Sequence, residues 1–244
     1  MKGIPVSGVS SEVVKEFAPS GRLRAAINQG NSVLAQKGPN GEALGITVEL
    51  ARELAKRLGV PVDLVIFDGA GKAFDALKGG LDIGFLAIEP ARAAEVDFTA
   101  PYVLIEGTYM APKDSALKVI EDVDRTGVRI AVNKGSAYDL YLTRTLKHAT
   151  LLRSDDGVAL FKKDKLEAAG GVRQPLELHA KTDGSVRVMD GRFMAIQQAM
   201  GMPKGRANAH AYLKGFVEEM KASGFVADAL KRSNQPDAQV APAG

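Results

Sequence analysis

Apolar and polar residues follow one another along the chain in two patterns, whose succession predicts an α/β fold with a mainly parallel sheet. Residues 46–58 carry apolar side chains three and four positions apart, the spacing of an amphipathic helix, and Gly59 follows as a stop signal. The short apolar runs at 61–67 and 82–88 predict buried strands. Helical and extended segments alternate through most of the remaining chain.

The same patterns predict the other elements. Further strands are expected at 23–28, 128–133, 151–153 and 166–172, and extended segments at 102–110, 186–189 and 192–197. Helices are expected at 72–78, from Pro90, at 136–147, 158–163 and 173–181, and over most of 206–232 with an interruption at Gly224. Residues 235–244 are polar and contain proline, so we expect a frayed tail.

Two α/β series joined by two extended passes predict a two-lobed protein. We expect one lobe to comprise residues 20–105 and 193–234 and the other residues 106–192, with residues 1–19 as an N-terminal extension and 235–244 as the tail. Ligands of open α/β sheets bind beyond the carboxyl ends of strands. The residues that follow positions 28, 85, 134 and 172 are therefore the first place to look for a site.

Composition narrows the function classes. The chain has 244 residues, 45% hydrophobic and 25% charged, which is ordinary for a globular protein and excludes disorder, collagen and coiled coil. The formal charge of +3 arises from 32 basic and 29 acidic residues, and aromatic residues make up only 6%, which argues against nucleic-acid binding. No apolar run approaches the ~20 residues of a membrane span, so no membrane insertion is expected.

The sequence contains few residues that could bind a metal or a cofactor. Cysteine is absent, which excludes disulfides and cysteine-based zinc sites, and His148, His179 and His210 are too scattered to predict a metal site. Residues 68–72 resemble a phosphate loop, but Ile66 and Ala73 stand where such a loop needs glycine and a hydroxyl, so a turn is predicted there. We expect no cofactor.

The first residues do not read as a secretory signal. Residues 1–11 contain one lysine and no continuous apolar stretch. We therefore expect the protein in the periplasm if an upstream signal was removed, and in the cytoplasm if the chain is native as given.

Residues 82–102, DIGFLAIEPARAAEVDFTAPY, form the most specific motif. Together with residues 45–65, GITVELARELAKRLGVPVDLV, they resemble the extracellular solute-binding family whose members serve ABC importers of polar amino acids. The resemblance extends from about residue 23 to residue 225. It implies a type II periplasmic-binding-protein fold with a ligand cleft between the lobes, a monomer, and an ABC permease as a partner.

Arg92 lies where the resemblance puts the arginine that holds the ligand carboxylate. A guanidinium near a helix N-terminus suits this role, because its planar fork grips a carboxylate with two hydrogen bonds. The neighbouring positions depart from the family pattern: Phe85, Ala87 and Glu89 stand where the family usually has residues with a side-chain hydroxyl. Three roles are open for Glu89: pairing with Arg92, binding a ligand ammonium, or capping the helix that begins at Pro90, and we favour capping.

In the second lobe, Ser136 is expected to cap a helix and is also a candidate hydrogen-bond donor to the ligand, with Ala137 beside it. Val172 and Arg173 stand where the family places an acidic partner for the ligand ammonium. This predicts a ligand that lacks the amine or carries a second carboxylate for Arg173. In the first lobe, Asn28 is a candidate wall of the pocket, or else a turn residue beside Gly30.

Three hypotheses follow. The first is a binding protein that captures a small, amino-acid-like carboxylate for ABC-type import, with non-amino or dicarboxylic acids preferred over neutral and basic amino acids. The second is an enzyme resembling cyclohexadienyl dehydratase, with Glu89 or Glu167 as the acid. A carboxylate beside an arginine has a lowered pKa, which suits a general acid poorly and favours binding. The third is a cytoplasmic ligand sensor.

Overall fold

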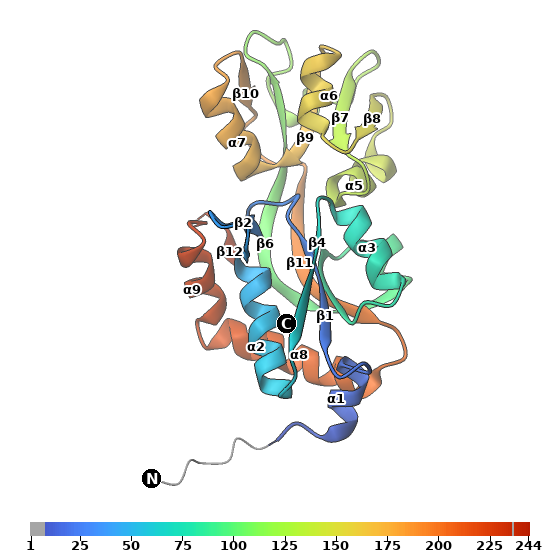
Figure 1. Ribbon diagram of the computed structural model, residues 1–244. Helices are drawn as coiled ribbons and strands as arrows, with labels where there is room; N and C mark the ends of the chain where they lie inside the picture. The colour runs from blue at the N-terminus through green and yellow to red at the C-terminus, as the bar shows by residue number, and fades with distance from the viewer. Residues whose placement is uncertain (1–7, 236) are drawn as a thin grey trace.

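The computed structural model describes residues 8–235 and 237–244. Two lobes lie one above the other, joined by the long strands β6 (Val96–Pro112) and β11 (Met194–Pro203), which run from one lobe into the other (Figure 1). The predicted α/β fold with two lobes is confirmed. Proposed lobe boundaries at residues 105–106 and 192–193 fall within or beside these crossing segments.

The sheet of the first lobe is built around three parallel strands. Its strand order is β4 (Val62–Phe67), β1 (Leu23–Asn28), β5 (Ile83–Ala87), β11 and β6, with β11 antiparallel to both of its neighbours. The helices of this lobe are α1 (Ser11–Phe17), α2 (Ile46–Leu58), α3 (Ala70–Lys78), α4 (Pro90–Ala93), α8 (Ala207–Ala222) and α9 (Phe225–Arg232). A small hairpin is formed by β2 (Gln36–Lys37) and β3 (Ala43–Leu44).

The second lobe repeats the plan on a smaller scale. Its strand order is β6, β9 (Ala168–Val172), β7 (Arg129–Asn133) and β8 (Thr150–Ser154), and β10 (Val186–Val188) pairs with the far end of β6. Its helices are α5 (Ala137–Thr145), α6 (Gly157–Lys163) and α7 (Arg173–Thr182), and a single 3₁₀ turn covers Ile120–Asp122.

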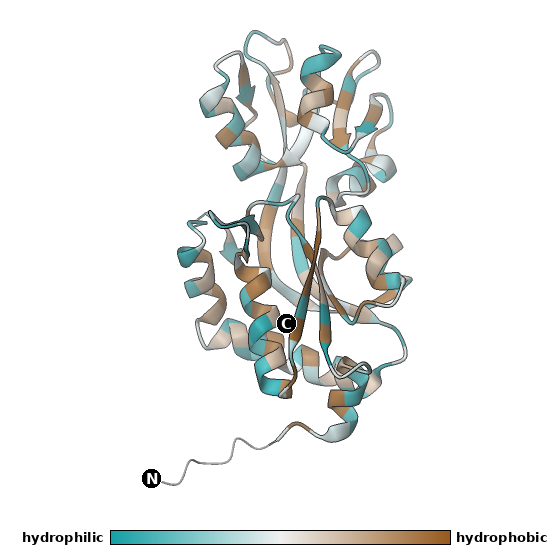
Figure 2. Cartoon of the chain, viewed as in Figure 1, coloured by the Kyte–Doolittle hydropathy of each residue, from teal (hydrophilic) through white to brown (hydrophobic). Residues whose placement is uncertain are grey.

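Burial explains why these segments form strands and helices. All five residues of β5 and all five of β9 are buried, as expected for strands covered on both faces. Helix α2 buries one face and ends at Gly59, whose φ of 69° is the left-handed conformation that glycine adopts without strain. Hydrophobic residues concentrate along strands such as β4 and β7 (Figure 2).

Residues 237–244 of the C-terminal tail pack on β6, so the prediction of a frayed end is wrong for them. Strand β12 (Gln239–Val240) pairs with Leu104 and Val103 of β6, and the Ala241 N–H donates to the Tyr102 carbonyl at 3.1 Å. An edge strand leaves backbone groups unpaired, and the tail satisfies them while burying Ala238 and Ala241.

Other elements also differ from the predictions: β6 is longer than the expected 102–110, and β2, β3 and the 3₁₀ turn were not predicted. Helix α3 begins at Ala70, two residues earlier than expected, because Gly69 takes the extended conformation of an N-cap. Strand β11 continues to Pro203, since pairing with both β5 and β6 extends it. Helix α1 was not predicted; it packs on α8, where Phe17 meets Tyr212 edge to face at 6.0 Å. The expectation for residues 1–11 falls largely on 1–7, outside the described residues.

Among the described helices, none combines the length and the apolar composition that crossing a bilayer requires.

Candidate functional site

A cavity of about 390 Å³ lies between the two lobes. Residues from both lobes line it, and most follow the carboxyl ends of β1, β4, β5, β7 and β9, as the general rule for open α/β sheets predicts. The lining includes Asn28, Asn31, Asp68–Lys72, Phe74, Phe85, Leu86, Ala87, Arg92, Asn133–Tyr138, Leu140, Asp155, Val172, Ile196 and Gln198.

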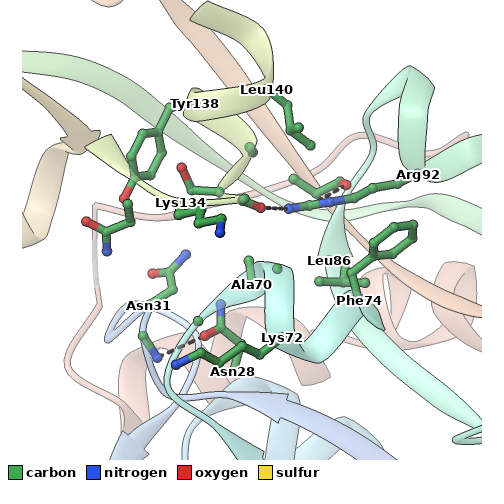
Figure 3. Close-up of a pocket in the computed structure, with 18 of the residues that line it drawn as sticks. Asn28, Asn31, Ala70, Lys72, Phe74, Leu86, Arg92, Lys134, Tyr138 and Leu140 are labelled. Atoms are coloured by element: carbon green, nitrogen blue, oxygen red, sulfur yellow. Dashed lines mark hydrogen bonds between the residues drawn. The ribbon is translucent and has the colours of Figure 1, made fainter. Parts of the chain in front are cut away.

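Arg92 is the largest polar side chain in this lining that is buried, with 1% of it exposed. Its Nη1 donates to the Ala87 carbonyl at 3.0 Å, and its Nη2 donates to the Gly135 carbonyl of the other lobe at 2.8 Å (Figure 3). Burial lowers the pKa of Arg92 to about 10, against a smaller opposing effect of Glu89. The guanidinium therefore stays charged at neutral pH, and three of its five N–H groups remain for a ligand.

Of the other residues predicted for the site in the first lobe, three line the cavity and Glu89 does not. Asn28, Phe85 and Ala87 line the cavity with Arg92. The Asn28 side-chain oxygen also accepts a hydrogen bond from the Gly30 N–H at 2.9 Å, so this residue is at once a turn residue and part of the wall.

In the second lobe, Ser136, Ala137 and Val172 line the same cavity. The Ser136 hydroxyl accepts from the Asp139 N–H at 3.1 Å, which confirms the predicted cap of α5. Tyr138, not predicted, is also part of the wall, and burial raises the pKa of its hydroxyl to about 12.

Glu89 does not cap α4, contrary to the favoured interpretation. It occupies the N-cap position, but its side chain makes no capping hydrogen bond and does not line the cavity. Instead the buried carboxylate pairs with Arg144 of α5 in the other lobe. Residues 89 and 144 are far apart in sequence, so local patterns carried no signal for this contact.

Arg173 lies outside the cavity, which overturns its expected contact with a second ligand carboxylate. Its Nε donates to Glu106 at 2.7 Å, in a hollow that Arg192 also lines. Consecutive residues of a strand point to opposite sides. At the end of β9, Val172 faces the cavity and Arg173, which begins α7, turns away from it.

Glu167 is also remote from the cavity. It lies just before β9, at the opposite end of that strand, and pairs with Arg129 at 2.8 Å. The hydrogen bond from Arg129 lowers the pKa of the Glu167 carboxyl, so this residue is not prepared to donate a proton at neutral pH. Neither carboxylate considered for an enzyme faces the cavity.

Residues 68–72 contribute to the site, although a simple turn was expected there. The N-terminal turn of α3 borders the cavity, and Lys72 pairs with Asp68 at 2.9 Å and with Asp155 of the other lobe at 3.3 Å. The strand-end rule could have pointed to this segment, because it follows the carboxyl end of the parallel strand β4, just as Asn28 ends β1.

Four contacts join the lobes around the cavity. They are the Arg92–Gly135 hydrogen bond, the Glu89–Arg144 and Lys72–Asp155 ion pairs, and a close backbone approach of Gly71 to Gly135. The lobes are therefore closed on each other in this structure. Across residues 8–235 and 237–244, His, Asp and Glu residues form no group of three able to hold a metal ion.

The chain belongs to the bacterial extracellular solute-binding proteins, family 3, whose model matches residues 23–233. This confirms the resemblance found in the sequence.

Relatives and solved structures agree with the family. L-cystine-binding protein TcyJ of Escherichia coli (strain K12) is 23% identical over 236 residues, which are 90% of this chain and 87% of the relative. The solute receptor for L-cysteine of Neisseria gonorrhoeae shares the fold, with a TM-score of 0.79 at 24% identity, covering 91% of this chain and 94% of that chain. Cyclohexadienyl dehydratase of Pseudomonas aeruginosa is 26% identical over 153 residues, which are 59% of this chain and 55% of the enzyme.

The dehydratase match is thus shorter than the match to the binding protein. Members of the family are solute-binding proteins, and the longer match is to a binding protein, so the comparisons place this chain among the binding proteins.

Proposed function

We propose that this protein captures a small, amino-acid-like carboxylate in the cavity between its lobes and delivers it to an ABC-type importer. The observation that carries the proposal is Arg92. Among the described residues no carboxylate forms an ion pair with this buried guanidinium, although it borders the cavity. A buried charge without a counterion is costly, and a bound carboxylate supplies the missing charge.

The relatives support the class of ligand. TcyJ is named for L-cystine and the Neisseria receptor for L-cysteine, both amino acids with a carboxylate. The four contacts that join the lobes around the cavity, here called the seam, support a mechanism in which the lobes close on the ligand. A ligand that touches both lobes selects the closed state. We propose that Arg92 holds the carboxylate and that Asn28, Phe85, Ala87, Ser136, Ala137 and Val172 surround the ligand.

The same proposal includes a monomer that works without membrane insertion. In the part of the chain that the structure describes, the exposed large apolar side chains lie on separate segments, which does not suggest an obligate interface; they are Leu44, Ile66, Val119 and Leu178. Light scattering coupled to size-exclusion chromatography tests the monomer, and a dimer would refute it.

A thermal-shift panel tests the function. The panel contains the common L-amino acids, L-cystine and small mono- and dicarboxylates. A ligand at 100 times its Kd stabilises the folded protein by about 2.7 kcal/mol. That is a rise in Tm of roughly 5–11 °C for a domain of this size. We expect at least one carboxylate to produce such a rise and Arg92→Met to abolish it.

Arg173→Met is the matched control, because it also removes an arginine near the lobe junction but outside the cavity. It should keep the ligand-induced shift. If no compound shifts the wild type, or if Arg92→Met responds like the wild type, the proposal is wrong.

A further inference from the structure

The three asparagines that line the cavity all have their side-chain oxygen occupied. Asn28 accepts from the Gly30 N–H at 2.9 Å, Asn31 from the Val33 N–H at 3.2 Å, and Asn133 from the Gly157 N–H at 2.8 Å. These bonds fix the amide orientation, because the flipped amide would set one N–H group against another. Each asparagine is therefore left with its NH₂ donors for the cavity.

Figure 3 shows how these groups lie. The amide nitrogens of Asn28 and Asn31, both from the first lobe, point toward Lys134, which comes from the end of β7 in the second lobe. Donors from the two lobes thus face each other across the cavity.

Lys134 is a second cation without a counterion and, unlike Arg92, it is exposed to solvent. It lines the cavity, and no described carboxylate lies within ion-pair distance of its ammonium. It directly precedes Gly135, whose carbonyl accepts from Arg92, so the two unpaired cations enter the cavity from adjacent points. An anion bound between the two cations is attracted by both of them, which offsets their mutual repulsion.

The acidic residues of the lining do not neutralise these cations. Asp68 and Asp155 both bind Lys72, and Asp75 is exposed on α3. Between the charged groups the wall is apolar, with Phe74 and Leu86 below Arg92. The cavity therefore offers hydrogen-bond donors and positive charge at its polar points and an apolar surface between them.

We propose that Lys134 determines specificity for a ligand with two acid groups, a small aliphatic dicarboxylate. This rests on the proposed function, in which Arg92 holds the first carboxylate. Lys134 binds the second carboxylate, and the amides of Asn28 and Asn31 donate to it from the opposite lobe. The ligand needs no α-amino group for these contacts: of the three carboxylates in the lining, Asp68 and Asp155 are engaged by Lys72, and Asp75 is exposed on α3.

Pairs of compounds that differ only in the second acid group test this. Calorimetry at pH 7.5 compares succinate with succinamate, glutarate with glutaramate, L-aspartate with L-asparagine, and L-glutamate with L-glutamine. We expect the diacid of the best-bound pair to bind at least 10-fold more tightly than its monoamide. The four pairs separate plain diacids from acidic amino acids.

Lys134→Met should weaken that diacid at least 10-fold and leave its monoamide unchanged. Lys163→Met, which removes an exposed lysine of α6 outside the cavity, should change neither. Thermal melting confirms that both variants fold.

The inference is overturned if monoamide and diacid bind equally, or if Lys134→Met binds the diacid as the wild type does. Binding of neutral amino acids that requires Arg92, without binding of any diacid, refutes this inference and leaves the proposed function standing. Failure of every compound in the wider panel refutes the proposed function itself.

Discussion

Gly71, the second residue of α3, sets how closely the two lobes approach. A Cβ atom built on it would lie 3.4 Å from the Cα of Gly135 and 3.5 Å from the Lys134 carbonyl, both in the other lobe. These are ordinary contact distances, so Gly71→Ala should fit the closed form. Gly71→Leu adds three more carbons at a seam where the backbones already touch.

The leucine should raise the free energy of closing the lobes without lowering the free energy of unfolding of the ligand-free protein. Overpacking a filled site costs about 1–3 kcal/mol. Because the clash exists only when the lobes are closed, that energy should appear as a 5- to 150-fold weaker affinity, on the scale of about 1.4 kcal/mol per factor of ten. Within the first lobe, either substitution favours the helix by up to about 1 kcal/mol over glycine, so Tm without ligand should not fall.

The absence of cysteine makes closure easy to measure. Two cysteines introduced at Lys56 of α2 and Lys163 of α6, both exposed, carry a donor and an acceptor fluorophore, one on each lobe. Titration with the tightest carboxylate of the panel follows energy transfer and affinity together. We expect Gly71→Ala to match the parent and Gly71→Leu to show less energy transfer and weaker binding.

Equal energy transfer and equal affinity for the alanine and leucine variants would refute the reasoning. In that case the ligand-bound lobes would not meet at the contact seen between Gly71 and Gly135.

Three further outcomes are expected. Arg144→Met strands the buried carboxylate of Glu89 and should weaken ligand binding about 5- to 30-fold by calorimetry, while the double variant with Glu89→Gln recovers most of the loss. Deleting residues 237–244 removes the pairing of β12 and should lower Tm by roughly 4–8 °C in calorimetric melts, for a loss of about 2 kcal/mol; an unchanged Tm would contradict the role of the tail. The hydrogen bond from Arg173 lowers the pKa of the Glu106 carboxyl in the folded state. The ionised carboxylate therefore stabilises the fold at pH values above the pKa of the unfolded chain, near 4.5, and this stabilisation is lost as the pH falls through the lower pKa of the folded state. Glu106→Gln should therefore be less stable than the parent at pH 7, by at most about 1 kcal/mol because the pair is partly exposed, and denaturant melts should converge below pH 4.5.

Local patterns in the sequence were sufficient for most of the fold. The alternation of apolar runs and amphipathic spacing predicted the strands and helices of both lobes, because burial on a sheet or a helix face repeats at the period of the element itself. The motif around Arg92 led to the family, the rule for strand ends pointed to the segments after positions 28, 134 and 172, and the resemblance singled out Asn28, Ser136 and Val172 there. The elements needed only neighbours along the chain, and the site residues needed the resemblance as well.

Contacts between distant segments could not be read in the same way. Whether Val172 or Arg173 faces the cavity depends on the register of β9 and the start of α7, because a shift of one residue turns each side chain to the opposite face of the sheet. Glu89 is buried against Arg144 only because the lobes close, and the tail is ordered only because β6 leaves an edge open beside it. Local spacing determined the elements, and the resemblance to a family supplied the arginine. Tertiary packing decided which charges meet between the lobes and which, at Arg92 and Lys134, are left for a ligand.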